Sequence, residues 1–152
     1  MMRGSRAHGQ SMVEFAFTLL VFLLLTAGVV DLARVAWAYN TVAFLSRDAA
    51  RYGAIPSHST VDIQTYAQTR CLNMLSGTCS VSSPVPPPTP ASNTAAIAVT
   101  RGTCGSTSSP VIVTVRYEAT VLLATLWGGL STLPLQATSQ MFVESAPPGG
   151  CL

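Results

Sequence analysis

The chain begins with one long apolar stretch. Residues 15–30 contain no charged side chain, and an α-helix over residues 12–30 would rise about 28 Å at 1.5 Å per residue. That rise is close to the thickness of the hydrocarbon core of a bilayer, about 30 Å. The pattern therefore predicts a single membrane-spanning helix, and no second stretch of this kind follows it.

The helical pattern continues beyond the predicted span. No proline occurs between Asp31 and Ala54, and the only glycine there is Gly53, which together with Pro56 supplies a stop signal. We predict one helix of about forty residues, roughly 60 Å long, whose outer half packs on the rest of the protein. The apolar stripe expected to face inward consists of Leu32, Val35, Ala36, Tyr39, Val42 and Ala43.

The next part of the sequence predicts a second, shorter helix and then a loop. The helix is expected from Thr60 to about Leu75, with Ser59 or Thr60 as its N-cap and Gly77 at its end. Residues 81–93 contain five prolines, a composition that favours extended polyproline geometry and prevents regular strand pairing. We interpret this segment as a surface loop.

Three later segments have the pattern of strands, being rich in β-branched residues or alternating in polarity: Ala95–Thr100, Val111–Thr120 and Leu133–Glu144. Three antiparallel strands need a cover for their apolar face, which the two helices can provide. The predicted fold class is therefore α+β, a long N-terminal transmembrane helix that extends into a small outer domain. The apolar run at residues 121–126 is expected either to be buried core or to contact the membrane or another subunit.

The chain thus divides into three predicted parts: a leader at residues 1–9, the long helix at residues 10–54 with its membrane span at about 12–30, and an outer α+β domain at residues 55–152 with a proline-rich loop at 84–90. The leader has two arginines and no acid, so it is expected to remain in the cytoplasm. The outer domain then lies on the other side of the membrane, in the periplasm if the membrane is a bacterial inner membrane.

The cysteines fit an oxidising compartment, because all four follow the predicted span: Cys71, Cys79, Cys104 and Cys151. Two disulfides are expected, and three pairings are open. Joining Cys71 to Cys79 closes a short loop and leaves the other two for each other. No CxxC pair occurs, so a zinc site, and a metal site in general, is not expected.

Charge and motifs give little support for catalysis or nucleic-acid binding. All eight basic residues are arginines, and without the two in the leader the remaining six balance six acids. His8 and His58 have neither metal-ligand spacing nor a nucleophile motif beside them, and no glycine-rich phosphate loop is present. We expect no enzyme activity, no cofactor and no nucleic-acid partner.

The start of the apolar stretch carries the most specific motif, Gly9 to Glu14, with arginines before it and the apolar helix after it. An ionised carboxylate at mid-bilayer costs about 2.5–3.5 kcal/mol, so Glu14 is expected at the membrane edge or beside a partner. The motif resembles the cleavage region of type IV prepilins. The resemblance implies that a prepilin peptidase cuts between Gly9 and Gln10, and that Glu14 pairs with the amino group newly exposed on Gln10.

Two other interpretations of this region are open. Glu14 can simply lie at the interface near a helix N-terminus, where the helix dipole favours a negative charge. The N-terminus can also be a secretory signal peptide with a small-x-small cleavage site at Ala36-Trp37-Ala38. That site is poorly placed, because Asp31 and Arg34 precede it and the apolar run is longer than such a segment requires.

Three segments together resemble the TadE-like family of tight-adherence pilus proteins: residues 13–15 (VEF), 30–34 (VDLAR) and 47–53 (RDAARYG). The similarity is strongest over residues 9–54 and weaker in the strand region, where the strand pattern and Glu144 contribute. It implies a minor pilin or pseudopilin of an Flp-type pilus, anchored in the inner membrane. Its implied partners are other pilin subunits, the prepilin peptidase, the inner-membrane assembly machinery and membrane lipid.

The charged residues of the outer half of the helix are candidates for ion pairs between subunits, or they serve only for solvation: Asp31, Arg34, Arg47, Asp48 and Arg51. An alternative function is also open. The protein can be a permanently anchored periplasmic scaffold or binding protein that never enters a filament.

Overall fold

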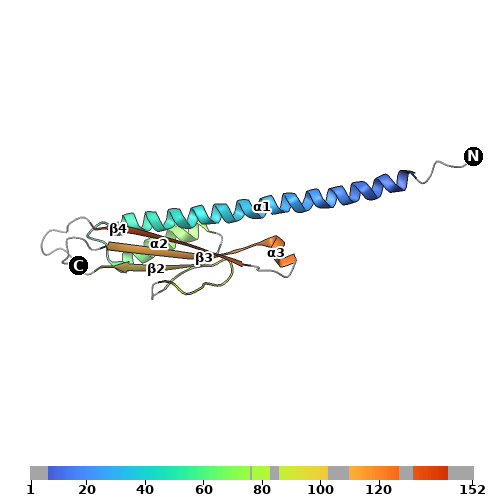
Figure 1. The fold of residues 1–152 in the computed structure, drawn as a ribbon. Coiled ribbons are helices and arrows are strands. Elements are labelled where there is room, and N and C mark those ends of the chain that lie inside the picture. The colour runs from blue at the N-terminus through green and yellow to red at the C-terminus, as the bar shows by residue number, and fades with distance from the viewer. Residues whose placement is uncertain (1–6, 76, 83–85, 103–109, 127–131, 144–152) are drawn as a thin grey trace, which may run out of the picture.

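The computed structural model describes residues 7–75, 77–82, 86–102, 110–126 and 132–143. The elements in chain order are α1 (Ala7–Gly53), α2 (Thr60–Met74), β1 (Cys79–Val81), β2 (Ala95–Arg101), β3 (Pro110–Thr120), α3 (Leu122–Leu126) and β4 (Thr132–Phe142). Figure 1 shows that the outer half of α1 lies along a small domain while its N-terminal half extends beyond it. The predicted α+β class with a long N-terminal helix is confirmed.

The helix α1 is continuous over 47 residues, as the absence of proline predicts. Its stretch from Gln10 to Val30 is exposed apart from half-buried Gly28, and it is long and apolar enough for a single membrane crossing. The helix ends at Gly53, which is buried. A Cβ there would lie 2.8 Å from both Ile63 Cδ1 and Val111 Cγ1, so glycine lets the helix end approach α2 and β3 closely.

The predicted inward face of α1 is partly wrong. Val42 is buried and Val35 packs against the core, but Leu32 and Tyr39 are exposed. The buried face is formed instead by Asp31, Ala38, Val42, Leu45, Ser46, Ala49, Ala50 and Gly53. Most of these residues are small, which brings the helix close to the sheet. Because the helix is apolar on several sides, hydrophobicity alone did not identify the face that packs.

The helix α2 begins with the predicted cap and ends differently from the prediction. The Asp62 backbone N–H donates to the Ser59 hydroxyl at 3.2 Å, and the Ser59 backbone N–H donates to Asp62 Oδ2 at 2.9 Å, which completes a capping box. The last helical residue is Met74, followed by Leu75 in extended conformation. Gly77 is therefore not the helix cap.

The capping box makes the stability of the protein depend on pH. Hydrogen bonds from Ser59 hold the pKa of Asp62 below its ordinary value of 3.8. The ionised form therefore stabilises the folded state above that value, and this stabilisation is lost as the pH falls through the lowered pKa. We expect Asp62→Asn to be less stable than the wild type at pH 7, with a difference that shrinks below about pH 4.

Urea unfolding of the full chain in detergent micelles at several pH values measures this difference. Val61→Ala is a suitable control, because Val61 is exposed on the same turn and has no titratable group. A stability difference between Asp62→Asn and the wild type that stays constant from pH 7 to pH 3 would contradict the prediction.

The sheet has four strands in the order β1-β2-β3-β4. The pairs β2–β3 and β3–β4 are antiparallel, as predicted, with Ala95 opposite Tyr117 and Tyr117 opposite Leu135. The prediction of only three strands is wrong, because β1 pairs with β2 in parallel and makes the sheet mixed. A strand of three residues is too short to show a period in the sequence.

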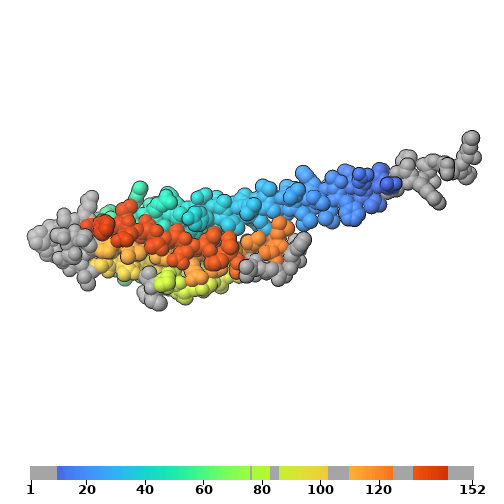
Figure 2. Space-filling view, in the orientation of Figure 1, coloured from blue at the N-terminus to red at the C-terminus, as the bar shows by residue number. Residues whose placement is uncertain are grey.

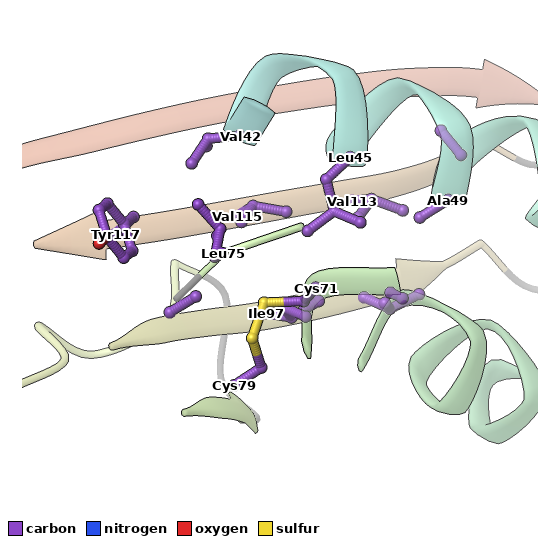
Figure 3. Close-up of a cluster of buried hydrophobic side chains, with 14 of the residues drawn as sticks. Val42, Leu45, Ala49, Cys71, Leu75, Cys79, Ile97, Val113, Val115 and Tyr117 are labelled. Carbon is purple, nitrogen blue, oxygen red and sulfur yellow. A yellow bond between two sulfur atoms is a disulfide. The ribbon is translucent and has the colours of Figure 1, made fainter. Parts of the chain in front are cut away.

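One face of the sheet and the two long helices enclose the core. The residues of β3 that alternate toward the helices are all buried: Val111, Val113, Val115, Tyr117 and Ala119. Figure 3 shows Val42, Leu45 and Ala49 of α1 directed toward this strand. On β4, Leu135, Ala137 and Met141 belong to or pack against the same cluster.

A disulfide joins Cys71 of α2 to Cys79 of β1, with 6.2 Å between the Cα atoms. The short loop considered in the sequence is therefore the one that is closed. A bridge across so short a loop typically stabilises the folded state by about 2.5 kcal/mol. Cys104 and Cys151 lie outside the described residues, as does Glu144.

Candidate functional site on the N-terminal helix

The Gly9–Gln10 peptide bond lies at the start of α1, which begins at Ala7. The first four backbone N–H groups of a helix lack intrahelical partners, so this turn is the easiest part of α1 to open. The next residues, Gln10 and Ser11, are exposed. A cut at this bond would leave the new amino group at the N-terminal end of α1, and the rest of the helix would not need to change.

Glu14 is exposed on the membrane-spanning part of α1. Its backbone carbonyl accepts a hydrogen bond from the Thr18 hydroxyl at 2.9 Å, a common way for threonine to be accommodated in a helix. Its carboxylate forms no ion pair with any residue that the structure describes. Within one chain, therefore, the described residues do not neutralise the charge of Glu14.

Asp31 has a different environment from that of Glu14. It is 6% exposed, and its Oδ2 accepts a hydrogen bond from the backbone N–H of Leu123 at 2.8 Å. Leu123 belongs to α3, so this bond ties α1 to the connection between β3 and β4. Arg34, one turn further along α1, is exposed and does not share this contact.

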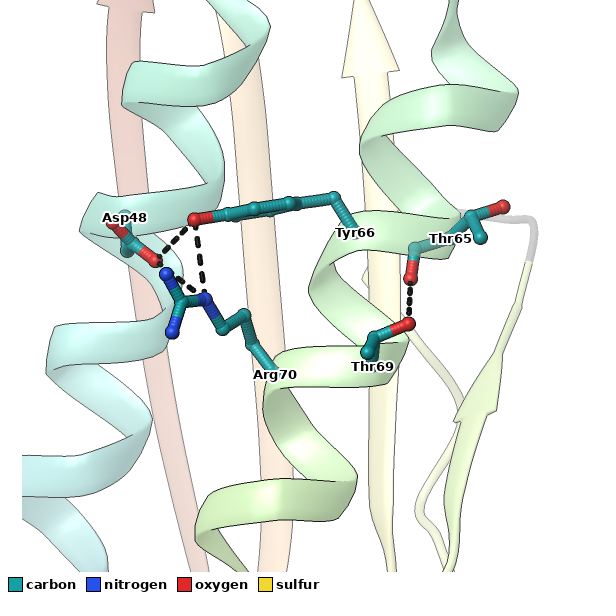
Figure 4. Close-up of polar contacts among 5 residues, drawn as sticks. All are labelled: Asp48, Thr65, Tyr66, Thr69 and Arg70. Atoms are coloured by element: carbon teal, nitrogen blue, oxygen red, sulfur yellow. Dashed lines mark hydrogen bonds and ion pairs between the residues drawn. The ribbon is translucent and has the colours of Figure 1, made fainter.

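Asp48 also has partners inside the chain. The Tyr66 hydroxyl donates to Asp48 Oδ2 at 2.9 Å, and Arg70 Nε lies 3.7 Å from the same oxygen. Figure 4 shows Tyr66 and Arg70 of α2 reaching across to Asp48 of α1. Tyr66 also stacks on Tyr52, with ring centroids 4.1 Å apart, and Tyr52 stacks on His58. The cluster joins the two helices and the turn between them.

A second contact holds the turn between these helices. The guanidinium of Arg101, at the end of β2, donates to the backbone carbonyls of His58 and of Pro56, the latter at 3.2 Å. Neither this role nor that of Tyr66 and Arg70 was predicted from the sequence. The spacing of Tyr66 and Arg70, four residues apart in a predicted helix, was the only local signal.

Three predicted ion-pair residues, Arg34, Arg47 and Arg51, are exposed on α1. None of them forms an ion pair with another residue in the described part of the chain. Exposed aromatic and aliphatic side chains occupy the same uncovered surface: Leu32, Trp37, Tyr39 and Phe44. In Figure 2 this half of α1 forms one long flank of the molecule. The helix therefore combines a packed face with a free face that is both basic and apolar.

Residues 9–51 match the family model described as TadE-like protein. Over these residues the chain is similar to TadE-like proteins. The match begins at the predicted cleavage glycine and ends two residues before α1 does, so it covers this helix and none of the sheet. No curated protein and no solved structure matches the chain.

The TadE-like match includes all five predicted ion-pair residues together with Gly9, Gln10 and Glu14. In the structure these residues do not form one site. Asp31 and Asp48 bind groups of α3 and α2, whereas Gln10, Glu14 and the three arginines are exposed on α1. The similarity points to involvement in a tight-adherence pilus system.

Proposed function

We propose that this protein is a TadE-like minor pilin or pseudopilin of an Flp-type, tight-adherence pilus. The observation that carries the proposal is the family match over residues 9–51. The exposed surface of α1 supports it, because Gln10 to Val30 has almost no cover from the rest of the chain. A helix of this kind can pack against lipid before assembly and against the helices of other pilin subunits afterwards.

Processing by a prepilin peptidase is the first step of the proposed function. The peptidase removes residues 1–9 and leaves Gln10 as the first residue. The position of the bond in the first turns of α1 supports this step, because few backbone hydrogen bonds must be broken to expose it. The arginines of the leader favour a cytoplasmic N-terminus in the inner membrane, with the outer domain in the periplasm.

Glu14 is proposed to act during packing of the helices. Its carboxylate has no described ion-pair partner in its own chain, and cleavage creates a positive amino group on Gln10 of a neighbouring subunit. An uncompensated charge in hydrocarbon is costly, so pairing the two charges favours the one axial register in which they meet. The inner-membrane assembly machinery would then add the subunit to the pilus.

The exposed arginines are proposed to contribute contacts outside the membrane. Arg34, Arg47 and Arg51 are free of ion pairs within the described residues, so they are available to acids of neighbouring subunits. Of the two acids predicted for this purpose, Asp31 is buried, whereas the Asp48 side chain is 27% exposed. Asp48 is therefore the more accessible partner.

The decisive experiment is mass spectrometry of the mature N-terminus in cells with and without a prepilin peptidase. We expect a chain that starts at Gln10 only when the peptidase is present. Gly9→Val should block the cut, and Gly4→Val is the matched control within the leader. A chain that starts after Ala38 would instead indicate a secretory signal peptide, and an intact N-terminus in both strains would refute the proposal.

Fractionation distinguishes a pilin from a permanently anchored scaffold. We expect the processed protein both in the membrane and in pili sheared from the cell surface. Exclusive recovery with membranes, under conditions where the major pilin is sheared off, would favour the scaffold.

A further inference from the structure

The short helix α3 packs on the membrane-spanning part of α1 and not only on its own domain. A Cβ at Gly28 would lie 3.6 Å from Leu123 Cδ1, which is ordinary van der Waals contact. Figure 2 shows α3, in orange, against the blue part of α1 beyond the sheet. The connection between β3 and β4 therefore carries α3 toward the N-terminal half of α1.

The position of Asp31 sets the depth of this contact in the membrane. Asp31 is the first charged residue after Glu14, and the separation of 17 positions corresponds to about 26 Å of helix. This distance is close to the hydrocarbon thickness, so Asp31 marks its outer boundary. Gly28 then lies about 4.5 Å inside that boundary, and Leu24 about 10 Å inside.

The hydrogen bond between Asp31 and Leu123 lowers the free-energy cost of placing α3 at this depth. A backbone N–H group that enters hydrocarbon needs a partner, because water is absent there. Asp31 supplies one at the point where α3 begins, through its Oδ2. Leu122, the first residue of α3, is 52% exposed. An exposed leucine is unfavourable in water and favourable in lipid.

A groove lies between α3 and the membrane-spanning part of α1. It has a volume of about 570 Å³ and is lined by Val21, Leu24, Leu25, Leu123 and Ala124. All five side chains are apolar, so the groove offers nothing to a lipid headgroup or to a polar peptide. Its α1 wall lies between about 9 and 15 Å inside the boundary marked by Asp31, where the surrounding medium is acyl chain.

We propose that α3 is immersed in the outer leaflet of the membrane and that the groove between α3 and α1 holds a lipid acyl chain. Asp31 is the positioning residue that holds α3 at this depth. The inference concerns the membrane-anchored form of the chain and does not depend on its incorporation into a pilus.

Photo-crosslinking tests the proposal on the full chain. The protein is reconstituted into vesicles of phosphatidylethanolamine and phosphatidylglycerol that contain phosphatidylethanolamine with a diazirine in one acyl chain. Labelled residues are then identified by mass spectrometry. We expect labels on Leu123 and Ala124 of α3 as well as on Leu24 and Leu25. Absence of label from α3, with α1 labelled, would overturn the immersion of α3.

Filling the groove tests its occupancy. Ala124→Phe should lower the labelling of Leu24 and Leu25 about tenfold relative to that of Val29, which is exposed outside the groove. Ala33→Phe, a change of the same size at an exposed site on α1, should leave the ratio unchanged. An unchanged ratio in Ala124→Phe would overturn the acyl-chain site. So would a wild-type product in which Leu24 is crosslinked to a second copy of the chain instead of lipid.

The role of Asp31 has its own readout. Asp31→Ala should lower labelling of α3 about tenfold while Val29 remains labelled, because α3 loses its hydrogen-bond acceptor. Asp31→Asn keeps an acceptor oxygen and should restore most of the label. Equal labelling of α3 in the wild type and in Asp31→Ala would show that Asp31 does not position it.

Discussion

Replacing Glu14 with alanine is expected to lower the amount of the protein in sheared pili by at least about tenfold, while cleavage after Gly9 continues. The physical reason is that, in the assembled bundle, the charged Gln10 amino group lies among the helices of neighbouring subunits, in a medium of low dielectric. Loss of the carboxylate leaves that amino group without a partner, and a loss of 1.4 kcal/mol is already a tenfold change in an equilibrium. Removing one partner of a buried ion pair typically costs more than this, about 3–5 kcal/mol.

Two further variants separate charge from shape at this position. Glu14→Gln keeps the size and a hydrogen-bond acceptor but removes the charge, so it should assemble nearly as poorly as Glu14→Ala. Phe17→Leu changes an exposed apolar neighbour on the same helix and should assemble normally. The measurement is the ratio of protein in sheared pili to protein in membranes. Wild-type ratios for Glu14→Ala would remove the proposed role of Glu14.

Replacing Gly77 with alanine is expected to destabilise the outer domain by about 3 kcal/mol. A Cβ at Gly77 would lie well inside van der Waals contact with the backbone carbonyl oxygen of Asn93. Asn93 cannot easily move, because its N–H donates to the Glu118 carbonyl at 2.8 Å and its φ is 55°. The chain must therefore shift where it enters β1, which would disturb the parallel pairing with β2.

The measurement is urea unfolding of the full chain in detergent micelles, with circular dichroism as the signal. Gly28→Ala is the matched control, since a Cβ there makes only an ordinary contact with Leu123 and alanine favours helix by about 1 kcal/mol. The control should be as stable as the wild type or slightly more so. Equal stability of Gly77→Ala and the wild type would show that the backbone relaxes at no cost.

Glu14 and Gly77 differ in how well local features of the sequence predicted their roles. The motif around Glu14 and the length of α1 are local features, and the structure contains the predicted long helix. The role of Gly77 was predicted incorrectly, because a glycine after a helix pattern is usually a cap. Its close approach to Asn93, sixteen residues later, depends on how two loops cross and has no local signature.

The cysteines give a similar contrast. Their position after the span indicated disulfides, but spacing alone left three pairings open. The structure joins Cys71 to Cys79 because α2 and β1 both contact β2 and contact each other. The fourth strand was missed for a related reason, since three residues acquire strand geometry only from a neighbour that already has it.

The sequence by itself determined the membrane helix, the capped α2, three strands and the TadE-like N-terminal pattern. Each depends on side-chain periodicity or on backbone chemistry within a few residues. Only the tertiary structure decided which face of α1 is buried, how β1 pairs, and that Asp31 binds Leu123, 92 residues away. Such long-range choices depend on how closely small residues let two elements approach and on which buried polar groups then find partners.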